Sequence, residues 1–226
     1  MTQSWRRELL LASGLAGLCA FMLAPLPAGS QEVVDDLLGG LAEWAKIESV
    51  LTHPRCLNCH TTTDYPTEGD KRRPHMLPIW RGPDGHGTTM KCQTCHGETN
   101  RAGVPGAQDW HMAPLSLAWE KAPGERASSA AICATLKHGE DDDFEGLIEY
   151  AQFASFVQWA WEPGKRRDGT ERSTPPLRRN GFVDSVKRWI SAGAPCPPPA
   201  PMPSAEVTGA VSPPEAAAPA PATPSP

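Results

Sequence analysis

The chain has 226 residues, including 25 prolines and 7 cysteines, and its formal net charge at pH 7 is −5. This mild acidity argues against a nucleic-acid-binding protein, which would carry a basic stripe. The cysteines are too sparse for a disulfide scaffold. Hydrophobic residues make up 39% of the chain, which excludes complete disorder and leaves room for one core. We therefore expect one globular domain with appended ends.

Residues 1–30 are predicted to be an export signal. Arg6 and Arg7 give a positive start, an apolar stretch runs from Leu9 to Leu26, and small residues at Ala28-Gly29-Ser30 suit a cleavage site. This signal predicts that the mature protein resides in the periplasm. The alternative is an uncleaved anchor that tethers the protein to the membrane, because about 18 apolar residues approach the minimum for a span.

Residues 31–196 form the predicted globular domain. It is expected to be mainly α with extensive loops and little or no sheet. The first expected helix covers residues 32–51, with Gly39-Gly40 weakening its middle. Gly139 and Gly193 are expected to stop two later helices. Those later helices are expected at residues 124–137, 143–159 and 182–191.

Two CxxCH motifs dominate the middle of the chain. This motif is the attachment signal for covalently bound haem c, in which both thiols bond to the haem vinyl groups and the histidine ligates the iron. Two copies behind an export signal predict two covalently attached haem c groups. The motif residues are Cys56, Cys59 and His60 in the first copy, and Cys92, Cys95 and His96 in the second.

The four cysteines of these motifs are also compatible with two other functions. Two CxxC pairs could hold a structural zinc ion, although the gap between the pairs exceeds the usual spacing in zinc sites. A thiol redox pair is also compatible with CxxC, but it does not require a histidine directly after the second cysteine.

The similarity between the two motifs extends beyond the attachment residues. Both copies read CxxCH, then 14 residues, then His-Met-x-Pro, with the second copy displaced by 36 residues. Such a repeat indicates a duplicated haem module. It nominates His75 and His111 as distal iron ligands, with Met76 and Met112 as the alternatives at equivalent positions. Which iron each residue serves is left open by the sequence.

Two further histidines are candidate ligands. His53 lies three residues before Cys56, and His86 lies in a Gly-rich turn; both are alternative distal candidates, and each could instead be a turn histidine. His138 follows a probable helix end and is expected to cap that helix. Six tryptophans are expected to pack in the core or line the haems: Trp80, Trp110, Trp119, Trp159, Trp161 and Trp189.

Cys133 and Cys196 remain after Cys19 is lost with the signal and four cysteines take haem. In an oxidising compartment such a pair is expected to form a disulfide, which would close a loop of about 60 residues. Two buried thiols are the alternative. Beyond the pair, residues 197–226 are rich in proline and alanine and are predicted to be a disordered tail.

The chain also resembles a family of small di-haem c-type cytochromes whose members are often labelled as isoquinoline 1-oxidoreductase subunits. The resemblance covers about residues 45–197 and leaves the tail outside it. It implies an exported electron-transfer partner for a molybdenum hydroxylase-type enzyme. Tyr150 stands where the resemblance leads us to expect a histidine. The matching stretches begin at His53, Arg81, Val104, Trp110, Trp159 and Gly193, and include HPRCLNCH, RGPDGHG and WHMAP.

The predicted function depends on how many histidines are available as iron ligands. Two attachment sites with enough histidines to fill both sixth iron positions predict an electron carrier that exchanges electrons with redox partner proteins and does not itself catalyse a reaction. The alternative is a small haem enzyme, such as a peroxidase or an oxidoreductase of sulfur or nitrogen compounds, with one open iron site. The sequence shows no separate set of acid and base residues for such an enzyme.

Overall fold

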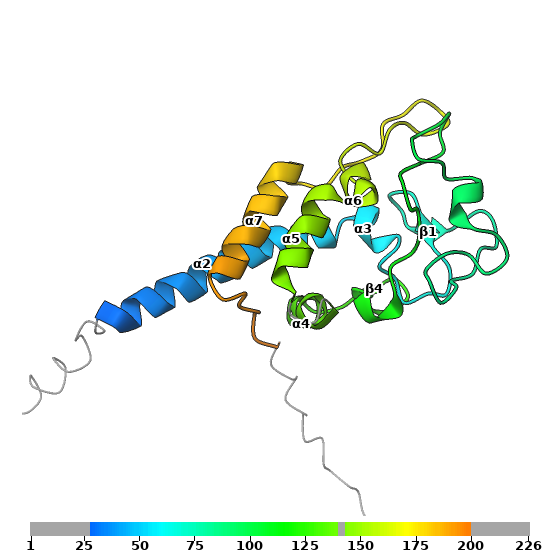
Figure 1. Cartoon of the computed structure of the whole chain (residues 1–226). Helices are drawn as coiled ribbons and strands as arrows, with labels where there is room; N and C mark the ends of the chain where they lie inside the picture. The colour runs from blue at the N-terminus through cyan, green and yellow to red at the C-terminus, as the bar shows by residue number, and fades with distance from the viewer. Residues whose placement is uncertain (1–27, 140–142, 200–226) are drawn as a thin grey trace, which may run out of the picture.

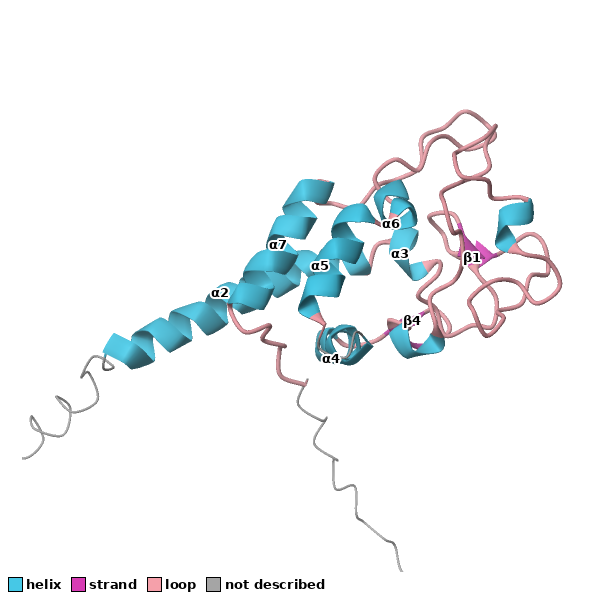
Figure 2. Cartoon of the chain, in the orientation of Figure 1, coloured by secondary structure: helices cyan, strands magenta, loops and turns pink. Residues whose placement is uncertain are grey.

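The computed structural model describes residues 28–139 and 143–199, so most of the predicted signal and tail lies outside the described residues. The protein divides into a helical half and a loop-rich half, as Figure 1 and Figure 2 show. The prediction of a mainly α fold with little sheet is confirmed. The described strands form two short antiparallel pairs, β1–β2 and β3–β4.

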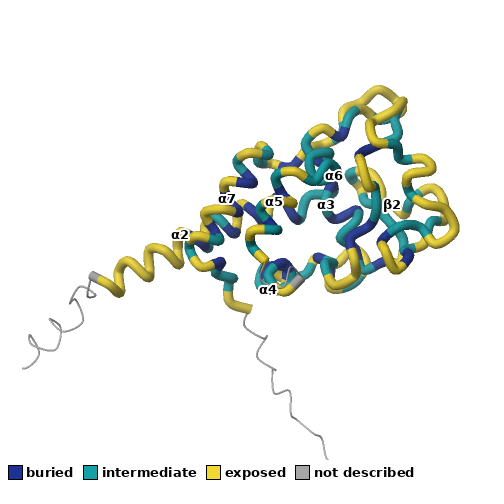
Figure 3. The backbone as a smooth tube through the Cα atoms, in the orientation of Figure 1, coloured by how far each residue is buried: buried dark blue, intermediate teal, exposed yellow. Residues whose placement is uncertain are grey.

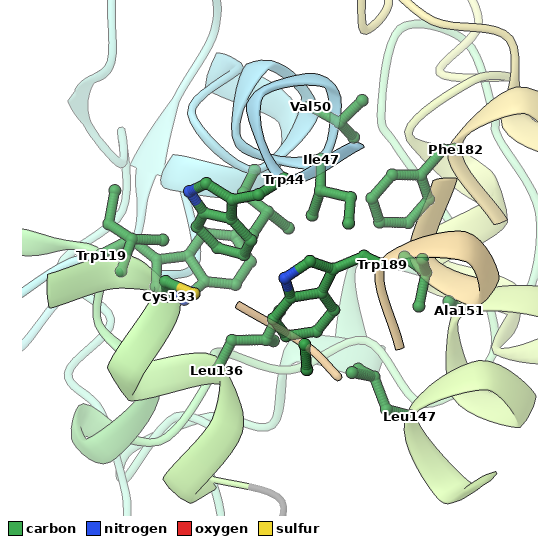
Figure 4. Packing of buried hydrophobic residues seen from close by; sticks show 14 of the residues in the cluster. Trp44, Ile47, Val50, Trp119, Cys133, Leu136, Leu147, Ala151, Phe182 and Trp189 are labelled. Carbon is green, nitrogen blue, oxygen red and sulfur yellow. The ribbon is translucent and has the colours of Figure 1, made fainter. Parts of the chain in front are cut away.

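The helical half is built around α2 (Ala28–Leu51) and α7 (Arg179–Ser191), which pack against each other. Trp44 on α2 and Trp189 on α7 are both almost fully buried, with ring centres 5.4 Å apart. α4 (Ser129–Gly139) and α5 (Phe144–Phe153) add their apolar faces to this core (Figure 4). Aliphatic side chains fill the space around the two indoles: Ile47, Val50, Ile132, Leu136, Leu147 and Val186.

The first predicted helix is confirmed and begins earlier than expected, so the proposed cleavage point after Ser30 falls in the first turn of α2. α2 runs through Gly39-Gly40 without a break. Close packing explains the glycine at position 40. A Cβ there would lie 2.5 Å from Pro195 Cγ and 2.9 Å from Ala192 Cβ. The missing side chain lets the segment that follows α7 cross close to α2.

The predicted start of the second helix at residue 124 is wrong. Residues Glu120–Ala122 (β3) and Glu125–Arg126 (β4) form a hairpin whose turn places Gly124 at a φ of +79°. A positive φ favours glycine and is incompatible with a helix start. α4 begins only at Ser129, because the Ser128 hydroxyl accepts the Ala131 N–H and caps the first turn. His138 lies in the last turn of α4, where a helix-capping role was expected.

The single helix predicted over residues 143–159 is two helices. α5 ends at Phe153, Ala154 is extended with a ψ of 122°, and α6 covers Ser155–Trp159. The break is held by the Gln158 amide, which donates to the carbonyls of Gln152 and Phe153 at the end of α5. Side-chain capping of these carbonyls replaces the backbone hydrogen bonds that a continuous helix would make.

The last predicted helix begins three residues earlier than expected, at Arg179, and is followed by Gly193 at a φ of +82°. This is the predicted glycine stop. The chain then turns back, and Cys196 forms a disulfide with Cys133 on α4, with Cα atoms 5.6 Å apart. The bridge thus joins the chain after α7 to the core helix α4.

The loop-rich half holds the short elements α3 (Pro54–Leu57), β1 (Thr67–Glu68), β2 (Arg73–Pro74), η1 (Cys92–Thr94) and η2 (Leu115–Leu117). Buried polar groups connect its loops. The Glu120 carboxylate forms an ion pair with Arg72 at 2.7 Å and accepts hydrogen bonds from the Thr61 hydroxyl and the Gly124 N–H. Loops held mainly by polar contacts leave few apolar side chains to fill this half.

The N-terminal part of α2 projects from the body, as the exposed stretch in Figure 3 shows. Val33, Leu37 and Leu38 are exposed there. Within the part of the chain that the structure describes, no helix has both the length and the apolar character required to cross a membrane.

Candidate functional site

Two cavities lie beside the two CxxCH motifs. The first-motif cavity has a volume of about 280 Å³ and is lined by Cys56, Cys59 and His60, together with apolar side chains of the helical half. The second-motif cavity has a volume of about 320 Å³ and is lined by Cys92, Cys95 and His96, together with polar and basic side chains. Each predicted attachment motif therefore faces a space of its own.

Both motifs fold as one helical turn. In the first, the His60 N–H donates to the Cys56 carbonyl at 3.0 Å, and in the second the His96 N–H donates to the Cys92 carbonyl at 2.9 Å. These hydrogen bonds, from the N–H of one residue to the carbonyl four positions earlier, place the two thiols and the histidine of each motif on one face of the turn. His53 and Pro54 start the first turn, with the His53 Nδ1 accepting the Arg55 N–H.

The two motif histidines are held in the same manner. The Nδ1 of His60 lies 2.7 Å from the Leu117 carbonyl, and the Nδ1 of His96 lies 2.8 Å from the Pro105 carbonyl. A carbonyl only accepts, so each Nδ1 carries the proton and each Nε2 keeps its lone pair. This is the tautomer that binds a metal through Nε2, with the backbone orienting the ring.

Each of these rings also stacks on a tryptophan. His60 lies 3.5 Å from Trp119 between ring centres, with a 5° angle between the planes, and His96 lies 4.7 Å from Trp110 at 1°. Burial lowers the pKa of His60 to about 4 and lowers the pKa of His96 as well. Both imidazoles are therefore neutral at physiological pH, as metal ligation requires.

The two distal candidates lie opposite the histidines of the other repeat. His75, from the first repeat, lines the second-motif cavity, where its ring centre is 6.1 Å from that of His96. His111, from the second repeat, lines the first-motif cavity together with His60. His111 also reaches the wall of the second-motif cavity. His75 therefore pairs with the motif histidine of the other repeat, and His111 lies where it borders both cavities.

Backbone carbonyls contact the Nδ1 atoms of these two residues as well. The Nδ1 of His111 lies against the Asp109 carbonyl, and that of His75 is 3.1 Å from the Leu77 carbonyl and 3.2 Å from the Leu77 nitrogen. Asp109 has a φ of +55°, a conformation that aspartate tolerates and that turns the chain immediately before Trp110 and His111. The contact with Asp109 leaves the Nε2 of His111 available.

The remaining ligand candidates are placed differently. His53 caps α3 through its Nδ1, and His86 contacts Gln93 and Asp109; neither lines either cavity. Met76 is 75% exposed and lies outside both cavities, whereas Met112 is buried and lines the second-motif cavity. Of the two candidate methionines, Met112 is therefore the one that lies beside a predicted site.

Within the described residues, one group of three metal-ligating side chains converges: His86, Asp109 and His111, whose ligand atoms lie within 4.8 Å of one another. The four motif cysteines do not form such a group, so the geometry does not favour a shared zinc site. Burial raises the pKa of Cys56 to about 12 and that of Cys59 to about 11. These pKa values are opposite to those of redox-active thiols, whose pKa is lowered.

The two cavities are adjacent and share lining side chains. Trp110 and Trp159 line both cavities and contact each other edge to face, with ring centres 4.8 Å apart. Cys59 and Arg55 also line both spaces. The two sites are therefore neighbours and share side chains.

Sequence reasoning missed part of the first-motif cavity. Phe156 and Tyr150 line it, and the Phe156 ring lies 4.9 Å from His111 and 5.8 Å from Tyr150. These residues come from α6 and the end of α5, where the sequence predicted one uninterrupted helix. The Nε1 of buried Trp119, in the wall of the same cavity, has no hydrogen-bond partner within the described residues.

Comparison of the chain with known protein families, curated proteins and solved structures finds no match.

Proposed function

We propose that the protein is an exported di-haem c-type cytochrome that transfers electrons between redox partner proteins. The observation that carries this proposal is the repeated local geometry. Each motif forms one helical turn that presents two thiols and a carbonyl-anchored, neutral imidazole to its own cavity. A haem group supplies one-electron exchange at its iron when bound.

The residues present fit two such groups. Cys56 and Cys59 would hold one haem with His60 as proximal ligand, and Cys92 and Cys95 would hold the other with His96. The loop-rich half has few buried apolar residues of its own, which agrees with a fold whose core is completed by cofactors.

We assign the distal ligands crosswise. His111 would complete the first-motif site, and His75 would complete the second-motif site. Two imidazoles that share a metal through bonds of about 2 Å have ring centres roughly 6 Å apart, and the ring centres of His75 and His96 are separated by 6.1 Å. In this arrangement Asp109 and His86 are outer partners of His111 that orient its ring.

Methionine ligation is the second arrangement at one of the sites. Met112 is buried and lines the second-motif cavity together with His75. Two histidine ligands give a lower reduction potential than a histidine and a methionine. The red-region charge-transfer band of methionine-ligated ferric haem distinguishes the two arrangements.

The surface at the second-motif cavity suits a transient partner. Leu77 and Met90 line this cavity and are each 42% exposed. Exposed apolar residues at the edge of a redox site fit the small interfaces of electron-transfer complexes. By the resemblance to the di-haem family, we propose that a periplasmic molybdenum hydroxylase-type dehydrogenase is one partner and the respiratory chain the other.

The decisive experiment is a haem count on the exported full-length protein. A pyridine haemochrome spectrum should give two c-type haems per chain, and the EPR spectrum of the oxidised protein should contain two low-spin signals. A preparation without covalently bound haem would end the proposal. Rapid stoichiometric binding of carbon monoxide to the reduced protein would instead favour the haem-enzyme alternative.

A further inference from the structure

Positively charged side chains gather in the wall of the second-motif cavity. Three segments bring them together: α3, the loop around residues 163–172, and η1 with its preceding residue. The five basic residues in this wall are Arg55, Lys91, Arg166, Arg167 and Arg172. The wall of the first-motif cavity includes one arginine, Arg55, and is otherwise mostly apolar. The two sites therefore differ in their electrostatic surroundings.

Two carboxylates lie near this positive charge, Glu68 in the same cavity wall and Asp70 beside it, and they balance only part of it. Arg55, whose side chain is 2% exposed, and Arg166 both pair with the single carboxylate of Asp70. Arg172 has no carboxylate partner among residues 28–139 and 143–199. Its guanidinium donates to backbone carbonyls, including that of Pro163 at 2.8 Å. The five basic residues, set against the carboxylates of Glu68 and Asp70, leave an excess of three positive charges.

Burial and the excess positive charge lower the pKa values of two of these arginines. Burial, followed by repulsion from Arg172 and Arg166, lowers the pKa of Arg55 to about 10. Burial and repulsion from Arg166 also lower the pKa of Arg172. Buried charges are normally paired, so a cluster of this kind favours the binding of an anion.

The loops that carry these arginines are tightly fitted. Gly103 has a φ of +88°, and a Cβ there would lie 2.7 Å from the backbone of Arg167. The Gly103 carbonyl accepts a hydrogen bond from Arg172. The arginines are therefore held by packing and by backbone contacts, a preorganised arrangement for binding an anion.

We propose that Arg55, Arg166 and Arg172 bind the two propionate carboxylates of the haem attached at Cys92 and Cys95. This inference rests on the proposed function. Two carboxylates would offset most of the excess positive charge, and guanidinium groups bind carboxylates in paired hydrogen bonds. The same chemistry would also accept an external carboxylate or phosphate, so the experiment must separate the two sources.

The test compares the reduction potentials of the two haems in the full-length protein and in Arg172→Gln and Arg166→Gln variants. Removing a positive charge near one iron favours its oxidised form, so the potential of that haem should fall clearly further than the potential of the other. Arg172→Lys, which keeps the charge, should restore most of the potential. The matched control is Arg178→Gln, at an exposed position just before α7 and outside both cavities.

A second measurement reports on the carboxylates themselves. The propionate bending modes in the resonance Raman spectrum should shift in Arg172→Gln and Arg166→Gln but not in Arg178→Gln. Unchanged Raman modes and potentials in protein with two haems per chain would overturn this inference and leave the proposed function intact. Absence of covalent haem would overturn the proposed function instead.

A third measurement tests whether the arginines bind an anion from solution. Acetate and phosphate, titrated into the haem-loaded protein against chloride at equal ionic strength, should leave both potentials where chloride leaves them. Saturable binding of acetate or phosphate that is lost in Arg172→Gln would show that the arginines accept an external anion, and would overturn the propionate assignment.

Discussion

The ring of His75 lies 6.1 Å from the ring of His96, although the two residues belong to different copies of the repeat. His111 makes the reciprocal crossing and lines the cavity of His60. A duplicated module would be expected to complete each site from its own copy. In the proposed ligation each site instead takes its distal histidine from the other copy, so the two copies would depend on each other.

The proposed crosswise ligation predicts which histidine each proposed haem depends on. In a Cys92→Ala/Cys95→Ala variant, which keeps only the first attachment motif, His111→Ala should convert the remaining haem to high spin. His75→Ala should leave it low spin. EPR of the oxidised single-haem proteins measures both outcomes, with His53→Ala as a control outside the cavities. The opposite pattern would mean that each repeat supplies its own distal ligand.

Gly40 is predicted to be required by the crossing of the chain after α7. In Gly40→Ala, the added Cβ would lie 2.5 to 2.9 Å from Pro195 and Ala192, so we expect a loss of about 1 to 3 kcal/mol in the free energy of unfolding. Gly39→Ala is the matched control, because nothing lies within 4 Å of its Cβ, and it should gain up to about 1 kcal/mol from helix propensity. Urea unfolding of the two variants should move in opposite directions; equal shifts would contradict the close approach.

The Cys133–Cys196 disulfide is predicted to stabilise the helical half. It closes a segment of 63 residues, and a loop of this length corresponds to about 4 kcal/mol in the chain-entropy treatment. Cys133→Ser/Cys196→Ser should lower the unfolding midpoint accordingly. Alkylation of the denatured wild-type protein without reductant should leave both residues unmodified. Modification of either thiol under those conditions would show that the bridge does not form.

The ion pair between Glu43 on α2 and Arg188 on α7 gives a pH-dependent contribution to stability. The hydrogen bond from Arg188 lowers the pKa of Glu43 from 4.5 to about 2. A lowered folded-state pKa stabilises the fold above the unfolded pKa, and that contribution is lost as the pH falls from about 4.5 towards 2.

Glu43→Gln should therefore lower the Tm at pH 7, by about 2 °C because the pair is partly exposed. It should also flatten the decline of Tm between about pH 4.5 and 2. The control is Glu149→Gln, at an exposed position on α5. Parallel Tm curves for wild type and Glu43→Gln would contradict the prediction. Thermal unfolding followed by circular dichroism supplies the curves.

Much of the helical half could be predicted from spacing, because α2 and α7 bury one regular apolar stripe each. The errors occur where local polar chemistry overrides that pattern. The Pro123-Gly124 turn delays α4, and the Gln158 side chain caps a break that apolar periodicity does not reveal. Gly40 reads as a weak point in the sequence, yet its role depends on Pro195, which lies more than 150 residues away.

The candidate site was predictable in its chemistry and less so in its geometry. CxxCH specifies two thiols and a histidine within one helical turn. An arrangement this local can be predicted from the sequence. The pairing of His75 with the second motif depends on how two loops cross, which no spacing encodes. The arginines that face the second-motif cavity come from segments more than 100 residues apart, so their convergence is likewise a property of the fold.

The shared wall of Trp110 and Trp159 has a thermodynamic consequence. Because Arg55 and Cys59 line both cavities, the electrostatic potential in one space depends on the charge held in the other. Such linkage is reciprocal: a charge gained on one side shifts the equilibrium on the other by the same free energy as the reverse. Two charges of the same sign held in the two cavities would therefore repel each other, and the second would be harder to add than the first.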